Sequence, residues 1–141
     1  MKKILSLVVA VLFLAASCKK ESSTPTCTLS AAAVSGNYKL TAVLYKASSL
    51  AQEIDLFLQY DACEKDNIYT FNPNGTYTIS DGVVACSPSD ADAGLWSLNG
   101  TTMTVDDEAG QVSDFSCSGF KAKLITDPAV GETTTLVFAR Q

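Results

Sequence analysis

A tight turn between two runs of aromatic and β-branched residues is the feature that most constrains how this chain can fold. Residues 68–71 (IYTF) and 76–80 (TYTIS) flank NPNG, which places Pro73 at the second position of a type I turn and Gly75 at the left-handed bulge position. This pattern predicts a β-hairpin in which Asn72 faces Thr76. The chain must therefore pair with itself in antiparallel fashion at this point.

Period-two alternation, which is typical of half-buried strands, continues along most of the chain after residue 36. Residues 36–45 place Tyr38, Leu40, Ala42 and Leu44 on one face, and Asn99-Gly100 predicts a second hairpin with a two-residue turn. Further strands are expected at residues 94–98, 101–105, 111–117, 119–126 and 133–139. Sequential hairpins of short strands favour an all-β fold, an eight-stranded antiparallel up-and-down barrel, over a sandwich.

One segment departs from the strand pattern. In SLAQEIDLFLQY, Ser49 and Gln52 form a possible capping box. Apolar residues then recur at helical spacing, namely Leu50, Ile54, Phe57 and Leu58. We therefore expect one short helix here, which would close one mouth of the barrel.

The N-terminus has the pattern of an export signal. Lys2 and Lys3 precede an apolar run at residues 4–16, which is shorter than the roughly 20 residues needed to span a bilayer. The run ends in LAASC, which resembles the lipobox of bacterial lipoproteins, where the cysteine receives a diacylglycerol and becomes the first mature residue. We expect residues 1–17 to be a signal peptide and Cys18 to be lipidated; an ordinary cleaved signal is the alternative.

The number of cysteines favours lipidation, because setting Cys18 aside from five leaves four that can all pair. Residues 18–35 are then the lipid anchor and a tether rich in Ser, Thr and Ala, and residues 36–141 are one domain. We expect the protein in the bacterial cell envelope, outside the cytoplasm and anchored to a membrane, with the outer membrane favoured.

The remaining cysteines are expected to form disulfides. If Asn72 faces Thr76, Cys63 faces position 85, one residue from Cys86; this favours pairing Cys63 with Cys86 and leaves Cys27 with Cys117. A zinc site is disfavoured, because no two cysteines lie closer than nine positions apart, unlike the short C-x₂-C spacing of structural zinc sites. A catalytic thiol would lack a histidine partner.

The composition argues against several classes of function. The chain has no histidine, which removes the commonest general base and imidazole metal sites. Without residues 1–17 it carries 8 basic and 15 acidic side chains, so nucleic-acid binding is not expected. The acidic stretches SPSDADAG and DDEAG do not fit the spacing of an EF-hand calcium loop and are interpreted as solvated loops. We expect no enzymatic activity, no cofactor and no metal.

A series of short motifs resembles the lipocalin-like domain of bacterial lipoproteins. The motifs are GNY at residues 36–38, CEKDNxYTF at 63–71, NGTY at 74–77, Cys86, GxWSL at 94–98 and TLVF at 135–138. Tyr38 stands where lipocalins usually have tryptophan. The resemblance covers nearly all of residues 36–141, and it implies an eight-stranded antiparallel barrel on a lipid anchor.

A barrel of eight strands can be filled by its own side chains or can hold one small ligand. If there is a pocket, the candidate ligand-binding residues are the inward aromatic ones: Tyr38, Tyr69, Phe71, Tyr77, Trp96, Phe120 and Phe138. Met103 and Leu136 are also expected to point inward. Two functions stay open: a tethered protein that binds a small hydrophobic ligand or is a passive envelope component, and a protein-interaction module using the loops at 90–93 and 106–109.

Overall fold

The computed structural model describes residues 26–141, which form nine strands and three short helical segments. The helical segments are α1 (Ala31–Val34), the 3₁₀-helix η1 (Leu56–Gln59) and α2 (Ala62–Lys65). The strands are β1 (Gly36–Lys46), β2 (Ile54–Asp55), β3 (Ile68–Phe71), β4 (Thr76–Ser80), β5 (Asp92–Asn99), β6 (Thr102–Val105), β7 (Glu108–Ser116), β8 (Gly119–Asp127) and β9 (Glu132–Arg140).

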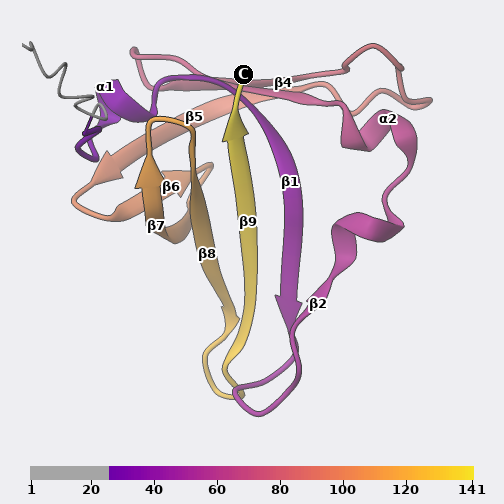
Figure 1. Cartoon of the computed structure of the whole chain (residues 1–141), viewed down its shortest axis with the longest axis vertical. Coiled ribbons are helices and arrows are strands. Elements are labelled where there is room, and N and C mark those ends of the chain that lie inside the picture. The colour runs from indigo at the N-terminus through magenta and orange to yellow at the C-terminus, as the bar shows by residue number, and fades with distance from the viewer. Residues whose placement is uncertain (1–25) are drawn as a thin grey trace, which may run out of the picture.

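All the strand pairs are antiparallel, and the sheet closes on itself. Its order is β2-β1-β3-β4-β5-β6-β7-β8-β9, with a further pairing of β1 to β9 that closes the barrel. Eight strands make the barrel, and the two-residue β2 is an extra strand on the edge of β1. In Figure 1, β1, β8 and β9 run side by side as one long wall, and β4 and β5 cross over one end of it. The predicted eight-stranded up-and-down barrel is confirmed.

The hairpin at NPNG has the predicted register. Phe71 pairs with Tyr77 and Ile68 with Ser80, and the Asn72 N–H donates to the Thr76 carbonyl at 2.8 Å. The second hairpin differs from its prediction, because Asn99 pairs with Thr102, so that Gly100 and Thr101 form the turn. Gly100 has a φ of +60°, which a type II′ turn requires at its first central position.

The predicted faces of β1 are right only for its first half. Tyr38 and Leu40 point inward and are buried, but the next buried residue is Val43 and not Ala42 or Leu44. The register of β1 against β9 shifts between Leu40 and Ala42, which marks a β-bulge. An extra residue in a strand reverses the facing of every later side chain, so the alternation read from the sequence fails beyond this point.

The predicted helix over residues 49–60 is wrong. The chain there forms a loop, then β2 and the single turn η1, and the only capping box in the described segment 49–66 is formed by Asp61 and Glu64 at the start of α2. Two of the expected buried residues, Leu50 and Leu58, are 96% and 75% exposed. The Asp55 carboxylate fixes the change in direction, because it accepts hydrogen bonds from the N–H groups of Val43 and Phe57, each at 3.0 Å.

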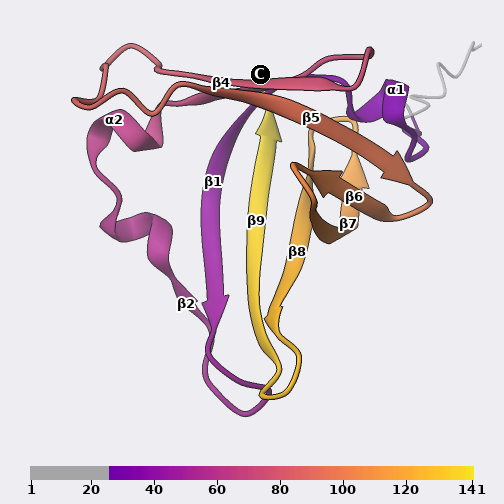
Figure 2. The same cartoon turned by 180° about the vertical axis from the view of Figure 1, so that it is seen from behind.

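The segment of η1 and α2 forms part of the barrel wall. β1 pairs with β3 only from Gly36 to Tyr38, after which the two strands separate. Figures 1 and 2 show η1 and α2 running along this side, between β2 and β3. Phe57 and Tyr60 pack against the buried core, with their ring centroids 5.6 Å apart. The segment therefore covers the opening between β1 and β3, and it does not form the predicted plug.

One end of the barrel is closed by packed aromatic rings and by α1. Tyr38 is fully buried, and its ring lies 5.1 Å from Phe120 and 5.9 Å from Phe71. Its hydroxyl donates to the Val34 carbonyl of α1 at 2.7 Å, so α1 lies directly over this end. Each such ring pair contributes about 0.5–1.5 kcal/mol beyond its buried area. Packed side chains therefore fill the interior of the barrel at this end.

Two disulfides hold segments outside the regular strands. They join Cys27 to Cys117 and Cys63 to Cys86, with Cα–Cα distances of 5.3 and 5.2 Å, and these are the two pairs that the sequence predicts. Such bonds are typical of proteins that fold outside the cytoplasm. The expected signal peptide at 1–17 and the lipidation at Cys18 lie outside the described residues. Within residues 26–141, no helix is both long and apolar enough to cross a membrane.

Candidate functional site

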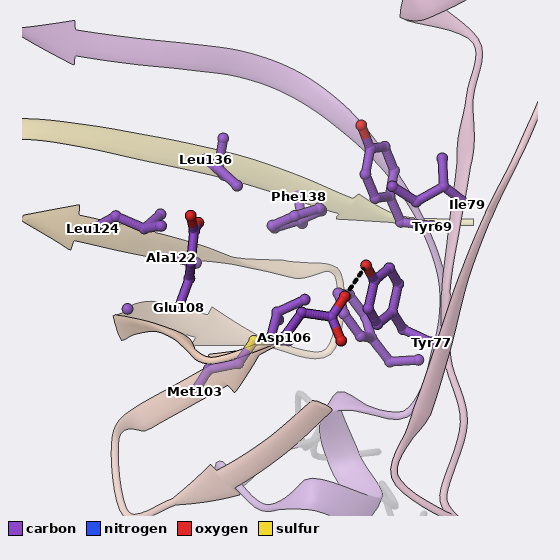
Figure 3. Close-up of a pocket in the computed structure, with 13 residues that line it drawn as sticks. Tyr69, Tyr77, Ile79, Met103, Asp106, Glu108, Ala122, Leu124, Leu136 and Phe138 are labelled. Carbon is purple, nitrogen blue, oxygen red and sulfur yellow. Dashed lines mark hydrogen bonds between the residues drawn. The ribbon is translucent and has the colours of Figure 1, made fainter. Parts of the chain in front are cut away.

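The barrel contains a cavity of about 370 Å³ that opens to the surface at one side. This volume is at the lower end of the range of roughly 300–1,000 Å³ found for small-molecule sites. Figure 3 shows the lining side chains converging from the facing walls of the barrel. The lining residues are Tyr69, Phe71, Tyr77, Ile79, Met103, Val105, Asp106, Glu108, Gly110, Ala122, Leu124, Leu136 and Phe138.

The strand register places the cavity next to the closed end. Phe71 and Phe138 form its inner wall, since both rings also pack on Tyr38, with centroids at 5.9 and 6.3 Å. The cavity then extends along β8 and β9 past Ala122, which pairs with Leu136. Gly110 on β7 also faces it, and a Cβ there would come within 3.3 Å of the Lys123 carbonyl oxygen. Small residues at 110 and 122 therefore leave the space that larger residues would fill.

A tight turn positions one carboxylate at the rim of the cavity, the part of the lining formed by Asp106 and Glu108. Asp106 and Asp107 form the two-residue turn between β6 and β7, with φ values of +43° and +72°. Positive φ at both positions defines a type I′ turn, for which aspartate is among the favoured residues. The Asp106 carboxylate accepts hydrogen bonds from the Tyr77 hydroxyl at 2.5 Å and from the Leu95 N–H at 2.8 Å. Gly94 makes room for it, since a Cβ there would come within 2.2 Å of the carboxylate.

These contacts fix the charge state of the rim. The Tyr77 hydroxyl and the Leu95 N–H hold the pKa of Asp106 below its usual range. The same hydrogen bond, together with burial, raises the pKa of Tyr77; its hydroxyl also lies 3.2 Å from the Asp92 carboxylate. Burial, reinforced by neighbouring negative charges, raises the pKa of Tyr69 to about 12. At neutral pH the site therefore has two neutral tyrosines beside an ionised Asp106.

The seven aromatic residues proposed from the sequence divide into two groups. Tyr69, Phe71, Tyr77 and Phe138 line the cavity. Tyr38 and Phe120 are not among its lining residues and pack in the closed end. Trp96 is buried against Phe71 with centroids 5.4 Å apart, and its indole N–H donates to the Asn72 carbonyl at 2.9 Å, which joins β5 to the NPNG turn.

The sequence-based site lacks the polar residues of the rim. The sequence predicts a solvated loop for Asp106 and Glu108, whereas the structure places both residues on the cavity lining. The alternation of the following strand carries a signal for Glu108: Gly110 and Val112 are buried, so the residue two positions earlier faces the same side. Nothing in the sequence indicates the contact of Asp106 with Tyr77, because it joins a turn to a strand 29 residues away.

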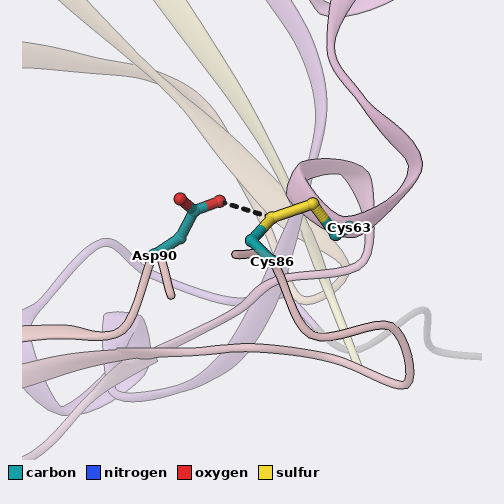
Figure 4. Close-up of side chains that lie close together, drawn as sticks. All are labelled: Cys63, Cys86 and Asp90. Carbon is teal, nitrogen blue, oxygen red and sulfur yellow. Dashed lines mark hydrogen bonds between the residues drawn. A yellow bond between two sulfur atoms is a disulfide. The ribbon is translucent and has the colours of Figure 1, made fainter. Parts of the chain in front are cut away.

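A second cluster of possible metal ligands involves one of the disulfides. The sulfur atoms of Cys63 and Cys86 and a carboxylate oxygen of Asp90 lie within 4.8 Å of one another (Figure 4). Both sulfurs belong to the disulfide, and a metal ion binds cysteine as the thiolate. The Asp90 carboxylate instead accepts a hydrogen bond from the Asn67 side-chain amide at 3.2 Å. This cluster therefore ties a loop to the start of β3.

A closed antiparallel barrel with one packed end and an apolar interior cavity defines a class of small-molecule binding barrels. Comparison with protein families gives a match to the lipocalin-like domain over residues 34–121, and the chain belongs to this family. Its members are generally non-catalytic binding proteins. No curated protein matches the chain. The matched region ends inside β8, and β9 completes the barrel beyond it by pairing with both β8 and β1.

Proposed function

We propose that this protein is a non-enzymatic binding protein of the bacterial cell envelope, which holds one small, largely apolar molecule in its barrel and is tethered to a membrane through a lipid on Cys18. The cavity of about 370 Å³ is the observation that carries the binding part of this proposal. Its lining is mainly aliphatic and aromatic, and a few polar groups at one edge can orient a ligand, which is the usual composition of small-molecule sites.

The lipid-anchor part rests on the sequence at residues 1–18, and two features of the described residues are compatible with it. The Cys27–Cys117 disulfide fastens the first described residues to the turn between β7 and β8. That turn and α1 lie at the closed end, since the Arg140 N–H donates to the Ser118 carbonyl and Tyr38 to that of Val34. A membrane anchor would thus be attached to the chain at the closed end, whereas the cavity lining extends along β8 away from this end as far as Leu124.

The alternative function, a protein-interaction module with a filled barrel, has less support. The interior is not filled, and one of its two expected contact loops is the tight β6–β7 turn, whose Asp106 carboxylate is engaged with Tyr77. The other loop, at residues 90–93, is exposed, but Asp90 is held by Asn67 and Asp81. Neither loop therefore presents a continuous free surface.

Binding can be tested with residues 19–141, which include every described residue and both disulfides, exported through a cleavable signal. Native mass spectrometry and calorimetry would measure one-to-one binding across a panel of small alkyl and aryl compounds. Ala122→Phe should abolish binding, because Ala122 lines the cavity and the new ring would occupy it. Trp96 fluorescence offers a second readout, since the indole packs on Phe71 of the inner wall.

Lys123→Phe is the matched control, because it adds the same ring to the next residue of β8, whose exposed side chain points out of the barrel. It should leave binding unchanged. Failure of the whole panel to bind the folded protein would overturn the proposed function, as would equal binding by the Ala122→Phe and Lys123→Phe variants.

A further inference from the structure

The cavity lining carries charge of one sign only. Asp106 and Glu108 are the charged residues among the described lining residues, which include no lysine or arginine. Both carboxylates belong to exposed residues of the lining, so they stay solvated, and Figure 3 shows the Asp106 carboxylate turned toward the Tyr77 hydroxyl. A third carboxylate, that of Asp92, lies next to the Tyr77 hydroxyl.

The basic side chains near the cavity point elsewhere. Lys121 forms an ion pair with Asp114 at 2.7 Å outside the barrel, and Lys123 is exposed on the outer face of β8. The Arg140 guanidinium lies over Tyr38 at the closed end, where it donates to the carbonyls of Ser35 and Ala33. A ligand carboxylate at the rim would therefore meet like charge with no basic partner in the cavity.

Aromatic rings line the same cavity. The rings of Tyr69, Phe71, Tyr77 and Phe138 belong to its lining. The two tyrosines stay neutral at physiological pH because their pKa values are raised. The faces of aromatic rings carry negative electrostatic potential and attract cations, ammonium groups included. Rings and rim carboxylates thus favour the same kind of ligand: an apolar body that carries a positive charge.

We propose that the cavity selects amphipathic amines, molecules with an alkyl or aryl body and a single ammonium group, over neutral analogues and over fatty acids. The body would lie against Leu136, Ala122 and Phe138, and the ammonium group would lie at the rim beside Asp106 and Glu108. This inference rests on the proposed binding function and narrows its ligand class. The overall excess of acidic over basic residues adds to the preference by attracting cations to the surface.

The experiment compares three probes that differ only in the head group: decylamine, decanol and decanoic acid at neutral pH, measured by calorimetry on the exported chain. We expect decylamine to bind most tightly and decanoic acid most weakly, with dissociation constants that differ by about tenfold or more. Added salt should weaken decylamine binding and leave decanol unchanged, because both carboxylates are at the surface.

Variants that remove charge test whether Asp106 and Glu108 cause the preference for the amine. Asp106→Asn combined with Glu108→Gln should bring the amine and the acid to within about twofold of each other, while decanol binding stays constant. Asparagine tolerates the positive φ at position 106; its amide oxygen can still accept from the Leu95 N–H, and its amide nitrogen can donate to the Tyr77 hydroxyl oxygen. Asp107→Asn is the matched control, since it removes a charge from the same turn at a residue that does not line this cavity. Glu108→Lys combined with Asp106→Asn gives the lining a net positive charge, and it should reverse the order and favour the acid.

The outcomes separate this inference from the proposed function. Decanol binding with decanoic acid equal to or tighter than decylamine would overturn the amine preference and leave the binding function standing. Amine binding that survives in the Ala122→Phe variant would place the amine on the acidic surface, and this too would overturn the inference. Absence of binding by all three probes to the folded chain would overturn the amine preference, and failure of the whole panel of alkyl and aryl compounds as well would overturn both.

Discussion

The guanidinium of Arg140 lies over the ring of Tyr38, with its central carbon 4.9 Å from the ring centroid. Arg140 is the last residue of β9 and Tyr38 lies near the start of β1, so this contact joins the two strands that close the barrel. The guanidinium also donates to the Tyr38 hydroxyl and to the carbonyls of Ala33 and Ser35. One side chain thereby connects the barrel closure to α1, which covers the closed end.

Replacing Arg140 by methionine should destabilise the fold by about 2 kcal/mol or more. The change keeps an apolar chain of similar length but leaves the Ala33 and Ser35 carbonyls without their charged donor and removes the cation–π contact. The measurement is urea unfolding at constant pH with the disulfides intact. Lys39→Met, on the adjacent strand, is the control and should change the free energy of unfolding only slightly. An equal loss of stability in both variants would contradict the role given to Arg140.

Alkaline pH should destabilise the protein through its buried tyrosines. Burial raises the pKa of Tyr69 to about 12, and the pKa of Tyr77 is also raised, against an ordinary value of 10. The folded state therefore favours the protonated phenols. Their contribution to the free energy of unfolding is complete below pH 10 and is lost as the pH rises from about 10 toward the folded-state values.

The check is the free energy of unfolding measured from pH 8 to 12 for the wild type, Tyr69→Phe and Tyr77→Phe. Each variant should lose less stability over this range than the wild type, because it lacks one phenol that must ionise. Tyr45→Phe is the control, because Tyr45 lies on β1 and is not among the residues that line the cavity. Parallel curves for Tyr69→Phe, Tyr77→Phe and Tyr45→Phe would contradict the assignment.

Local patterns predicted the barrel well, because its strands are joined in sequence order. Alternation and turn residues are short-range signals, and residues 68–71 and 76–80 form strands with the predicted bounds and register. The failures arise where a local pattern is overridden by distant contacts. The apolar spacing from Leu50 to Leu58 suits a helix, but Asp55 caps Phe57 and holds Val43 of β1, and this contact is set by the tertiary fold.

The candidate site was predictable only in part for a related reason. Inward alternation identified Tyr69, Phe71, Tyr77 and Phe138 as possible lining residues, and all four line the cavity. It could not separate them from Tyr38 and Phe120, which also face inward but lie in the packed end. Whether an inward ring faces a space or another ring depends on the sizes of residues on other strands. Here Gly110 and Ala122, which both line the cavity, are small enough to leave a space beside the inward rings.

Removing either disulfide should destabilise the fold, and the long-range bond should matter more. The chain-entropy model gives about 3.4 kcal/mol for the loop closed by Cys63 and Cys86, and about 4.6 kcal/mol for the loop closed by Cys27 and Cys117. Paired substitutions to alanine, followed by urea unfolding, would measure both. Adding reductant to the variant that lacks both bonds is the control and should change nothing. Peptide mapping without reductant should recover these two pairs; free thiols at Cys63 and Cys86 would contradict the pairing.

Cys18→Ser should remove the lipid and release the protein from the membrane. The expected anchor is a diacylglycerol on Cys18, and burial of its chains holds the protein at the bilayer by about 0.8 kcal/mol per CH₂ group. Cells fed an alkynyl fatty acid should label the wild type but not Cys18→Ser, and fractionation should move the variant from the membrane to the soluble fraction. Ser17→Ala is the matched control, because it keeps a small residue at the cleavage site and leaves the cysteine in place. Fatty-acid label on the Cys18→Ser variant, or an unlabelled wild type, would overturn the lipid anchor while leaving the barrel and its cavity unaffected.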